Sequence, residues 1–147
     1  MSDLTRVLVP LRWSDMDAFA HVNNVSFLRL LEDARVLSLS QWFGEGLRVV
    51  DHNVLVARHE IEYHAPLEYR HDPVAIDIWV TRVGGAGYDL GYIVTDPPEV
   101  GEQQYAVAAS TMACYDFDTE SPRRMSDHER EALAPLLGPP APFRRRR

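Results

Sequence analysis

The chain has 147 residues, which suits one globular domain of ordinary size. Hydrophobic residues make up 46% and charged residues 25%, and the formal net charge of −7 argues against a general nucleic-acid-binding protein. Cys114 is the only cysteine, which excludes an intrachain disulfide and a cysteine-rich metal site. The sequence shows no apolar run of membrane-spanning length and no signal-peptide pattern, so we expect a cytoplasmic protein that does not enter a membrane.

The first part of the chain predicts a strand followed by a long helix. Apolar residues alternate through residues 6–13, as in a strand with one buried face. Residues 14–22 form an irregular loop, and Asn23 or Asn24 can then cap a helix that runs towards Trp42. Apolar residues lie on more than one side of this helix, which indicates that other elements cover it on more than one side.

The rest of the chain predicts a series of strands and a short final helix. The strands are expected at residues 54–64, 74–82, 88–95 and 104–115. Ser126 and Glu129 form a capping box at the start of the final helix. We therefore expect an α+β domain over residues 1–138, with one helix packed on an antiparallel sheet. Residues 139–147 are rich in proline and arginine and are expected to form a flexible tail.

The loop before the long helix holds a dense group of polar residues. Asp15, Asp17 and His21 lie just before the helix start, where free backbone amides favour negative charge. Such amides can stabilise a developing oxyanion, and a nearby carboxylate can attack a thioester or activate water as a general base. The residues alone leave a second interpretation open. In that interpretation both carboxylates only organise the loop and cap the helix, because short loops before helices are often acidic.

The order of residues in this loop adds a family resemblance. Residues 15–27 read DMDAFAHVNNVSF, which resembles the signature D-x-D-x-x-G-H-V-N-N-x-x-Y/F of the 4-hydroxybenzoyl-CoA thioesterase family of hotdog proteins. EDAR at residues 32–35 is similar to the family's E-x-A-R, and IEYHAP at residues 61–66 is similar to its I-x-Y-x-x-P. The resemblance covers residues 6–137, and the first motif is the most specific of the three.

The resemblance implies a fold and an activity. The fold would be a hotdog, in which an antiparallel sheet wraps around one long central helix. The protein would be a homodimer or homotetramer with its active site at a subunit interface. It would hydrolyse an acyl-CoA to a free acid and coenzyme A, without a cofactor or a metal. Two alternatives remain open at this stage: a thioesterase for acyl-carrier protein, and a non-catalytic protein that binds acyl thioesters.

The resemblance also implies roles for particular residues. Asp17 matches the catalytic carboxylate, and the backbone N–H of Asn24 would polarise the thioester carbonyl. Glu32 is an alternative base, because related hotdog enzymes place a catalytic glutamate on this helix. The residues expected to bind substrate are His21, Asn23, Phe27 and Arg82. His21 has a second possible role, which is to hold the backbone of the loop.

Two positions depart from the family pattern. Ala20 stands where the signature has glycine, and it would be strained there if the position requires a positive φ. The turn at residues 84–87 is Gly-Gly-Ala-Gly, without the serine or basic residues that often lie near the phosphates of coenzyme A. Arg82 is the nearest cation to this turn in the sequence, so binding of the nucleotide would depend on it or on Arg123 and Arg124.

Overall fold

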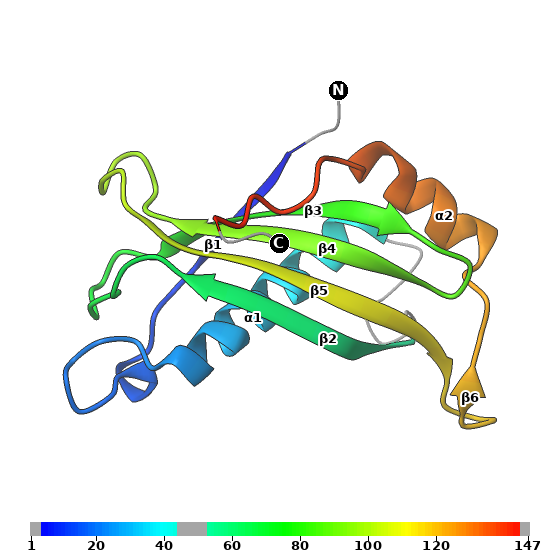
Figure 1. Cartoon of the computed structure of the whole chain (residues 1–147), viewed down its shortest axis with the longest axis horizontal. Helices are drawn as coiled ribbons and strands as arrows, with labels where there is room; N and C mark the ends of the chain where they lie inside the picture. The colour runs from blue at the N-terminus through cyan, green and yellow to red at the C-terminus, as the bar shows by residue number, and fades with distance from the viewer. Residues whose placement is uncertain (1–3, 44–52, 145–147) are drawn as a thin grey trace.

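The computed structural model describes residues 4–43 and 53–144, and its main element is a six-stranded antiparallel sheet (Figure 1). The strands are β1 (Thr5–Val9), β2 (Val54–Tyr63), β3 (Val74–Val83), β4 (Gly87–Thr95), β5 (Gln104–Asp116) and β6 (Ser121–Pro122). The helices are α1 (Asn24–Phe43) and α2 (Asp127–Leu133), and short 3₁₀ turns lie at Trp13–Asp15 and Ala134–Leu136. The strand order is β1-β3-β4-β5-β2, and β6 pairs with β5.

The sequence pattern explains the limits of these elements. The alternating residues 6–13 predicted a longer first strand, but β1 ends at Val9, because Pro10 has no N–H to donate to a ladder. The later strands lie where the alternation predicted them. Ser126 accepts a hydrogen bond from the Glu129 N–H at the start of α2, which confirms the predicted capping box.

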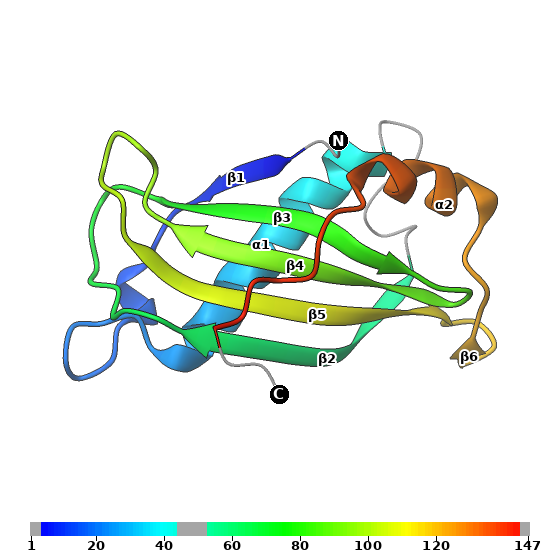
Figure 2. The same ribbon diagram turned by 45° about the horizontal axis from the view of Figure 1, so that its top comes forward.

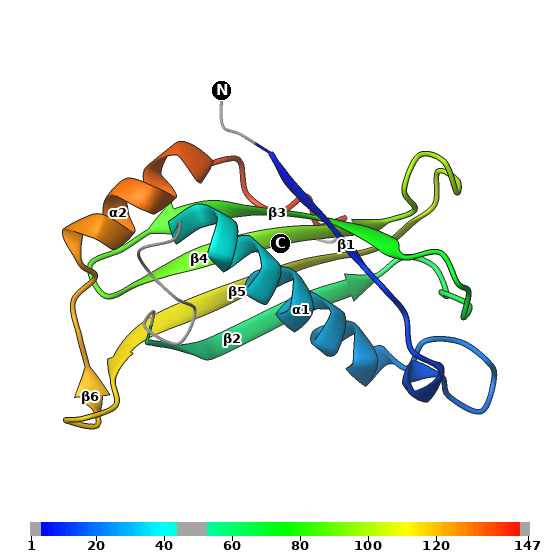
Figure 3. The same ribbon diagram turned by 180° about the vertical axis from the view of Figure 1, so that it is seen from behind.

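The core lies between α1 and one face of the sheet. Figure 3 shows α1 crossing this inner face, and α1 contacts both β1 and β3. The helix buries apolar side chains such as Phe27, Leu31 and Ala34 against the alternate residues of the strands. The start of α1 is thereby fixed close to the end of β2, where the candidate site lies. Within the described part of the chain, no helix is both long and apolar enough to cross a membrane.

The C-terminal segment packs on the outer face of the sheet, as Figure 2 shows where it crosses β3, β4 and β5. Its composition predicted a flexible tail from residue 139, but residues 139–144 contact the sheet. The indole N–H of Trp79 donates to the Pro139 carbonyl over 2.7 Å, and Ala141 and Phe143 are buried beside Val107. These residues pack on the sheet because their apolar side chains are buried against it, while prolines have little backbone entropy to lose.

Candidate active site

A pocket of about 430 Å³ lies between the start of α1 and the segment that follows β2. Its lining residues are Asp17, His21, Val22, Asn24, Phe27, Tyr63, His64, Ala65, Pro66 and Leu67. The structure therefore brings together most of the residues that the sequence signature singled out. It does not bring Asn23 or Arg82 into this pocket, and Glu32 is exposed on α1 outside it.

Asp17 is half-buried and is held in a tight turn by backbone hydrogen bonds. Its Oδ1 accepts from the N–H of Phe19 over 2.8 Å and from the N–H of His21 over 3.3 Å. Its own N–H donates to the His21 carbonyl over 2.8 Å. Within the described chain, Oδ2 has no hydrogen-bond partner. The carboxylate is thus oriented through one oxygen, and the other oxygen is available to water or substrate in the pocket.

Ala20 completes this turn with a positive φ of 60°. An alanine in the left-handed region costs about 1–2 kcal/mol, because its Cβ lies close to the following carbonyl. The Ala20 N–H donates to the Asp17 carbonyl over 3.2 Å, and Met16 and Val22 are paired across the base of the loop. These interactions hold the loop in the conformation that the family signature fills with glycine, and the strain expected for alanine is present.

The start of α1 provides a free backbone donor. Asn24 is the first residue of the helix, and its N–H donates to no acceptor within the described ranges. The Asn23 side chain caps the helix, because its Oδ1 accepts from the Val25 N–H over 2.9 Å. The uncommitted Asn24 N–H and the positive end of the helix dipole therefore face the same pocket as Asp17.

The second wall of the pocket was largely missed by sequence reasoning. The Tyr63 hydroxyl donates to the Asn24 carbonyl over 2.8 Å, and the Tyr63 ring packs edge-on against Phe27 with centroids 5.3 Å apart. His64, to which sequence reasoning assigned no role, also lines the pocket, and its Nε2 lies 2.7 Å from Glu62. The IEYHAP motif was the available signal, because it places these residues at the end of β2, beside the helix start.

His21 contributes to the loop through its backbone and to the pocket through its side chain. Its backbone N–H donates to Asp17, and its side chain lines the pocket with 36% of its area exposed. The ring nitrogen Nε2 lies 3.9 Å from the Glu68 carboxylate. A ring in this position can contact a substrate while its main chain orients the carboxylate of Asp17.

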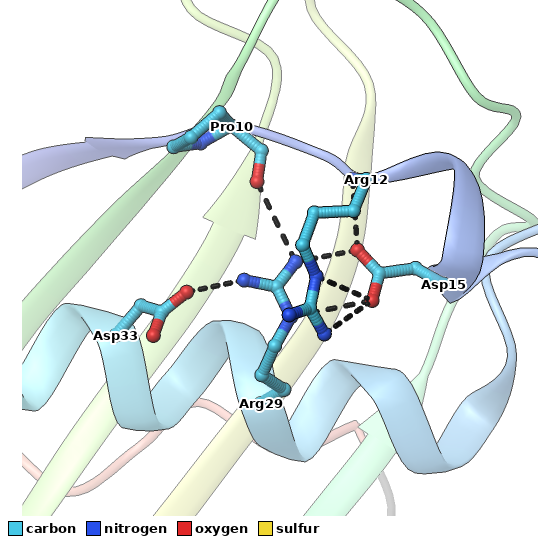
Figure 4. Close-up of polar contacts among 5 residues, drawn as sticks. All are labelled: Pro10, Arg12, Asp15, Arg29 and Asp33. Carbon is cyan, nitrogen blue, oxygen red and sulfur yellow. Dashed lines mark hydrogen bonds and ion pairs between the residues drawn. The ribbon is translucent and has the colours of Figure 1, made fainter.

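Asp15 differs sharply from Asp17, because its carboxylate is enclosed by the guanidinium groups of Arg12 and Arg29 (Figure 4). Its side chain is only 1% exposed, and it accepts from the Arg12 backbone N–H over 2.9 Å and from the Arg29 Nε over 3.2 Å. Burial raises the pKa of Asp15, but the hydrogen bonds from Arg29 and Arg12 outweigh it and hold this pKa below its usual value. Arg29 is also paired with Asp33 one turn along α1. Asp15 therefore ties the loop to the helix and is not accessible to a substrate.

The arginines considered for nucleotide binding lie elsewhere. Arg82 is on the outer face of the sheet, where its Nε lies 2.9 Å from Asp89, and it lines a separate groove of about 300 Å³. Arg123 is paired with Glu129 over 2.8 Å. The structure therefore does not support the predicted contact of Arg82 with a substrate in the Asp17 pocket of the same chain. Among residues 4–43 and 53–144, no three His, Cys, Asp or Glu side chains are grouped to hold a metal ion.

Comparisons with known proteins agree with this geometry. The model of the thioesterase-like superfamily matches residues 11–134. The long-chain acyl-CoA thioesterase FadM of Escherichia coli (strain K12) is 27% identical over 136 residues, which is 88% of this chain and 96% of FadM.

Solved structures give the same result. A thioesterase from Thermus thermophilus, solved in complex with coenzyme A and Zn, has a TM-score of 0.74 at 26% identity and covers 92% of this chain and 95% of its own. A predicted thioesterase from Bacillus stearothermophilus has a TM-score of 0.81 at 20% identity, covers 94% of this chain and 99% of its own, and supports the fold. Because the family match spans most of the chain and includes the pocket, the chain belongs to the thioesterase-like superfamily.

Proposed function

We propose that the protein hydrolyses an acyl-CoA to a carboxylic acid and coenzyme A, with Asp17 as the reacting carboxylate. The observation that carries this proposal is the meeting of two groups in one pocket. Asp17 presents a carboxylate oxygen and Asn24 a helix N–H, neither of which has a hydrogen-bond partner among the residues that the structure describes. Superfamily membership supports thioester hydrolysis. FadM, named as an acyl-CoA thioesterase, and the Thermus thioesterase solved with coenzyme A support coenzyme A as the carrier.

The chemistry follows from this arrangement. The thioester carbonyl would accept from the Asn24 N–H, which stabilises the negative charge that develops on the oxygen. Asp17 either takes a proton from water as the water oxygen adds to the acyl carbon, or attacks that carbon itself to form an anhydride that water then hydrolyses. In both routes the C–S bond breaks and the thiolate leaves, so the products are the acid and coenzyme A.

The reaction class can be tested directly. The purified protein should release free thiol from at least one substrate in a panel of short, long and aromatic acyl-CoAs, and a chelator should not abolish the release. Asp17→Asn protein prepared in parallel provides the background rate. If ligand binding is measurable but no acyl-CoA or acyl-carrier protein yields free thiol, the protein is a binding module and the proposal is wrong.

We further propose that the arrangement is a hotdog, with α1 as its central helix, and that two copies pair along β2. The support is that β2 lies at one edge of the sheet, where Leu55 and Val56 are 42% and 41% exposed. An unpaired edge strand with exposed apolar side chains is usually covered by another chain. A dimer would place a second copy close to Tyr63, which is on the same strand and lines the active pocket.

The assembly proposal predicts at least a dimer in dilute solution. Val56→Lys should reduce the dimer fraction, because it introduces a charge at the proposed contact. Leu8→Lys is the matched control, since Leu8 is 51% exposed on β1 at the opposite edge of the sheet. Light scattering with activity measured at the same concentrations tests this. A wild-type monomer that stays active at nanomolar concentration would rule out a shared site.

A further inference from the structure

A chain of buried polar groups lies between α1 and the sheet, outside the machinery described above. Arg35 is 7% exposed, and its guanidinium donates to the Tyr92 hydroxyl over 3.1 Å. The Tyr92 hydroxyl donates to Ser110 Oγ over 2.8 Å, and Ser110 Oγ lies 2.7 Å from His59 Nδ1. These four residues come from α1, β4, β5 and β2, and we call them the Arg35 cluster.

The direction of the hydrogen bonds in this cluster is set by Arg35. An arginine has donors only, so the Tyr92 oxygen accepts and its proton goes to Ser110. Ser110 can then donate its own proton to His59 Nδ1, which leaves the remaining proton on Nε2. Burial and the charge of Arg35 both lower the pKa of His59, which favours this neutral ring at pH 7. Both ends of the cluster therefore present donors.

Among residues 4–43 and 53–144, no carboxylate accepts from this cluster. Within the described chain no carboxylate pairs with Arg35, although a buried guanidinium usually has an anionic partner. Ser38 lies one turn further along α1, is fully buried, and its Oγ has no hydrogen-bond partner among the described residues. A positively charged, donor-rich site of this kind favours a carboxylate as its ligand.

The position of the cluster connects it with the active pocket. Phe27 and Tyr63 pack together in the pocket wall, and Arg35 and His59 are close enough to interact electrostatically. Arg35 lies eight positions after Phe27 on α1, which is about 12 Å. His59 lies four positions before Tyr63 on β2, which is about 13 Å. The half-buried Ile61 lies between Tyr63 and His59 on the same face of β2, so the side chain between the pocket and the cluster on this strand is apolar.

We propose that the Arg35 cluster binds a carboxylate at the far end of the acyl chain, so that the preferred substrates are CoA thioesters of dicarboxylic acids. This inference rests on the proposed function. The reacting carbonyl would lie at Asn24, the methylenes would pass along α1 and β2, and the terminal carboxylate would accept from Arg35 and His59. Asn24 and Arg35 are eleven positions apart on α1, about 16 Å, so an extended chain that spans them has roughly twelve carbons.

The test compares two substrates of equal length, one ending in a methyl group and the other in a carboxylate. The wild-type protein should show a kcat/KM at least about 10-fold higher for the carboxylate form, because a charge-assisted hydrogen bond in a buried site discriminates by this amount. Arg35→Met should remove the preference and change kcat/KM for the methyl form by less than about 3-fold. Arg58→Met is the matched control, because Arg58 is next to His59 on β2 but exposed, and it should leave the preference unchanged.

The possible outcomes separate the two proposals. If neither substrate is hydrolysed, the proposed function fails. If the two substrates are hydrolysed with equal kcat/KM, only the present inference fails. Replacing an unpaired buried cation by methionine should keep or raise the Tm. If Arg35→Met instead lowers the Tm or the dimer fraction and leaves the substrate preference intact, Arg35 is a structural residue and the inference is overturned.

Discussion

Asp17→Asn is expected to lower kcat by at least about 10²-fold, with little change in KM or Tm. A general base typically contributes about 10² to 10⁴-fold, and a nucleophile can contribute more. Asparagine has the size and shape of aspartate, and its Oδ1 can still accept from the N–H groups of Phe19 and His21. The loop should therefore keep its conformation while the negative charge is lost. Steady-state kinetics with a free-thiol readout and thermal melts measure both effects.

The control for this prediction should remove a charge without touching the reaction. Glu68→Gln is suitable, because the Glu68 side chain is 81% exposed and lies near His21. Its kcat should stay within about 3-fold of the wild type, since an exposed charge is screened by solvent. If Asp17→Asn is active while Asp15→Asn is folded but inactive, the catalytic carboxylate is Asp15 and the assignment of Asp17 is wrong. Gel filtration of each variant is needed, because a site at an interface can also be lost by dissociation.

Asp15→Ala should destabilise the protein by about 3–5 kcal/mol, because it leaves the buried end of Arg29 without its carboxylate. For a domain of this size that is a fall in Tm of roughly 10 °C. Asp33→Ala is the matched control, since Asp33 pairs with the same guanidinium but its side chain is 40% exposed. A partly exposed ion pair contributes about 0–1 kcal/mol, so this variant should melt within about 3 °C of the wild type. Equal Tm losses for both variants would contradict the assigned role of Asp15.

The same carboxylate predicts a pH dependence. The pKa of Asp15 is lower in the folded protein than in the unfolded chain, so its stabilising effect is fully present above the unfolded value, near 3.8. The effect is lost as the pH falls through the folded pKa. Asp96 also has a lowered pKa, because hydrogen bonds from Tyr105 and Arg70 outweigh its burial, and it contributes in the same direction. The Tm difference between wild type and Asp15→Ala should therefore stay nearly constant down to about pH 4 and shrink as the pH falls further.

The sequence predicted local features better than long-range ones. Alternation of apolar residues located the main strands, since one strand face packs against α1. The signature at residues 15–27 brought Asp17 and Asn24 to the same pocket because both belong to one loop and the helix it enters. Sequence spacing provided no indication of the pairing of Arg35 with Tyr92, which are 57 residues apart.

Two of the predicted binding residues have other partners in the structure. Arg82 is a cation beside a turn in the sequence, but its side chain lies on the outer face of the sheet, where it pairs with Asp89. Asn23 was grouped with the binding residues because it belongs to the signature, but its side chain has a closer acceptor role at the helix start. In both cases a nearby protein group, Asp89 for Arg82 and the Val25 N–H for Asn23, already binds the polar atom that was expected to contact the substrate.

The C-terminal segment limits how this sheet can meet another molecule. Open sheets often stack face to face, with side chains of the two layers interlocking about 10 Å apart. Here residues 139–144 already cross the outer face, and Phe143 takes one of the positions that a second layer would otherwise fill. Any contact that a neighbouring sheet makes over β3 to β5 must therefore include this segment or displace it. The size of the side chains in residues 139–144 therefore sets how closely a second sheet can approach β3 to β5.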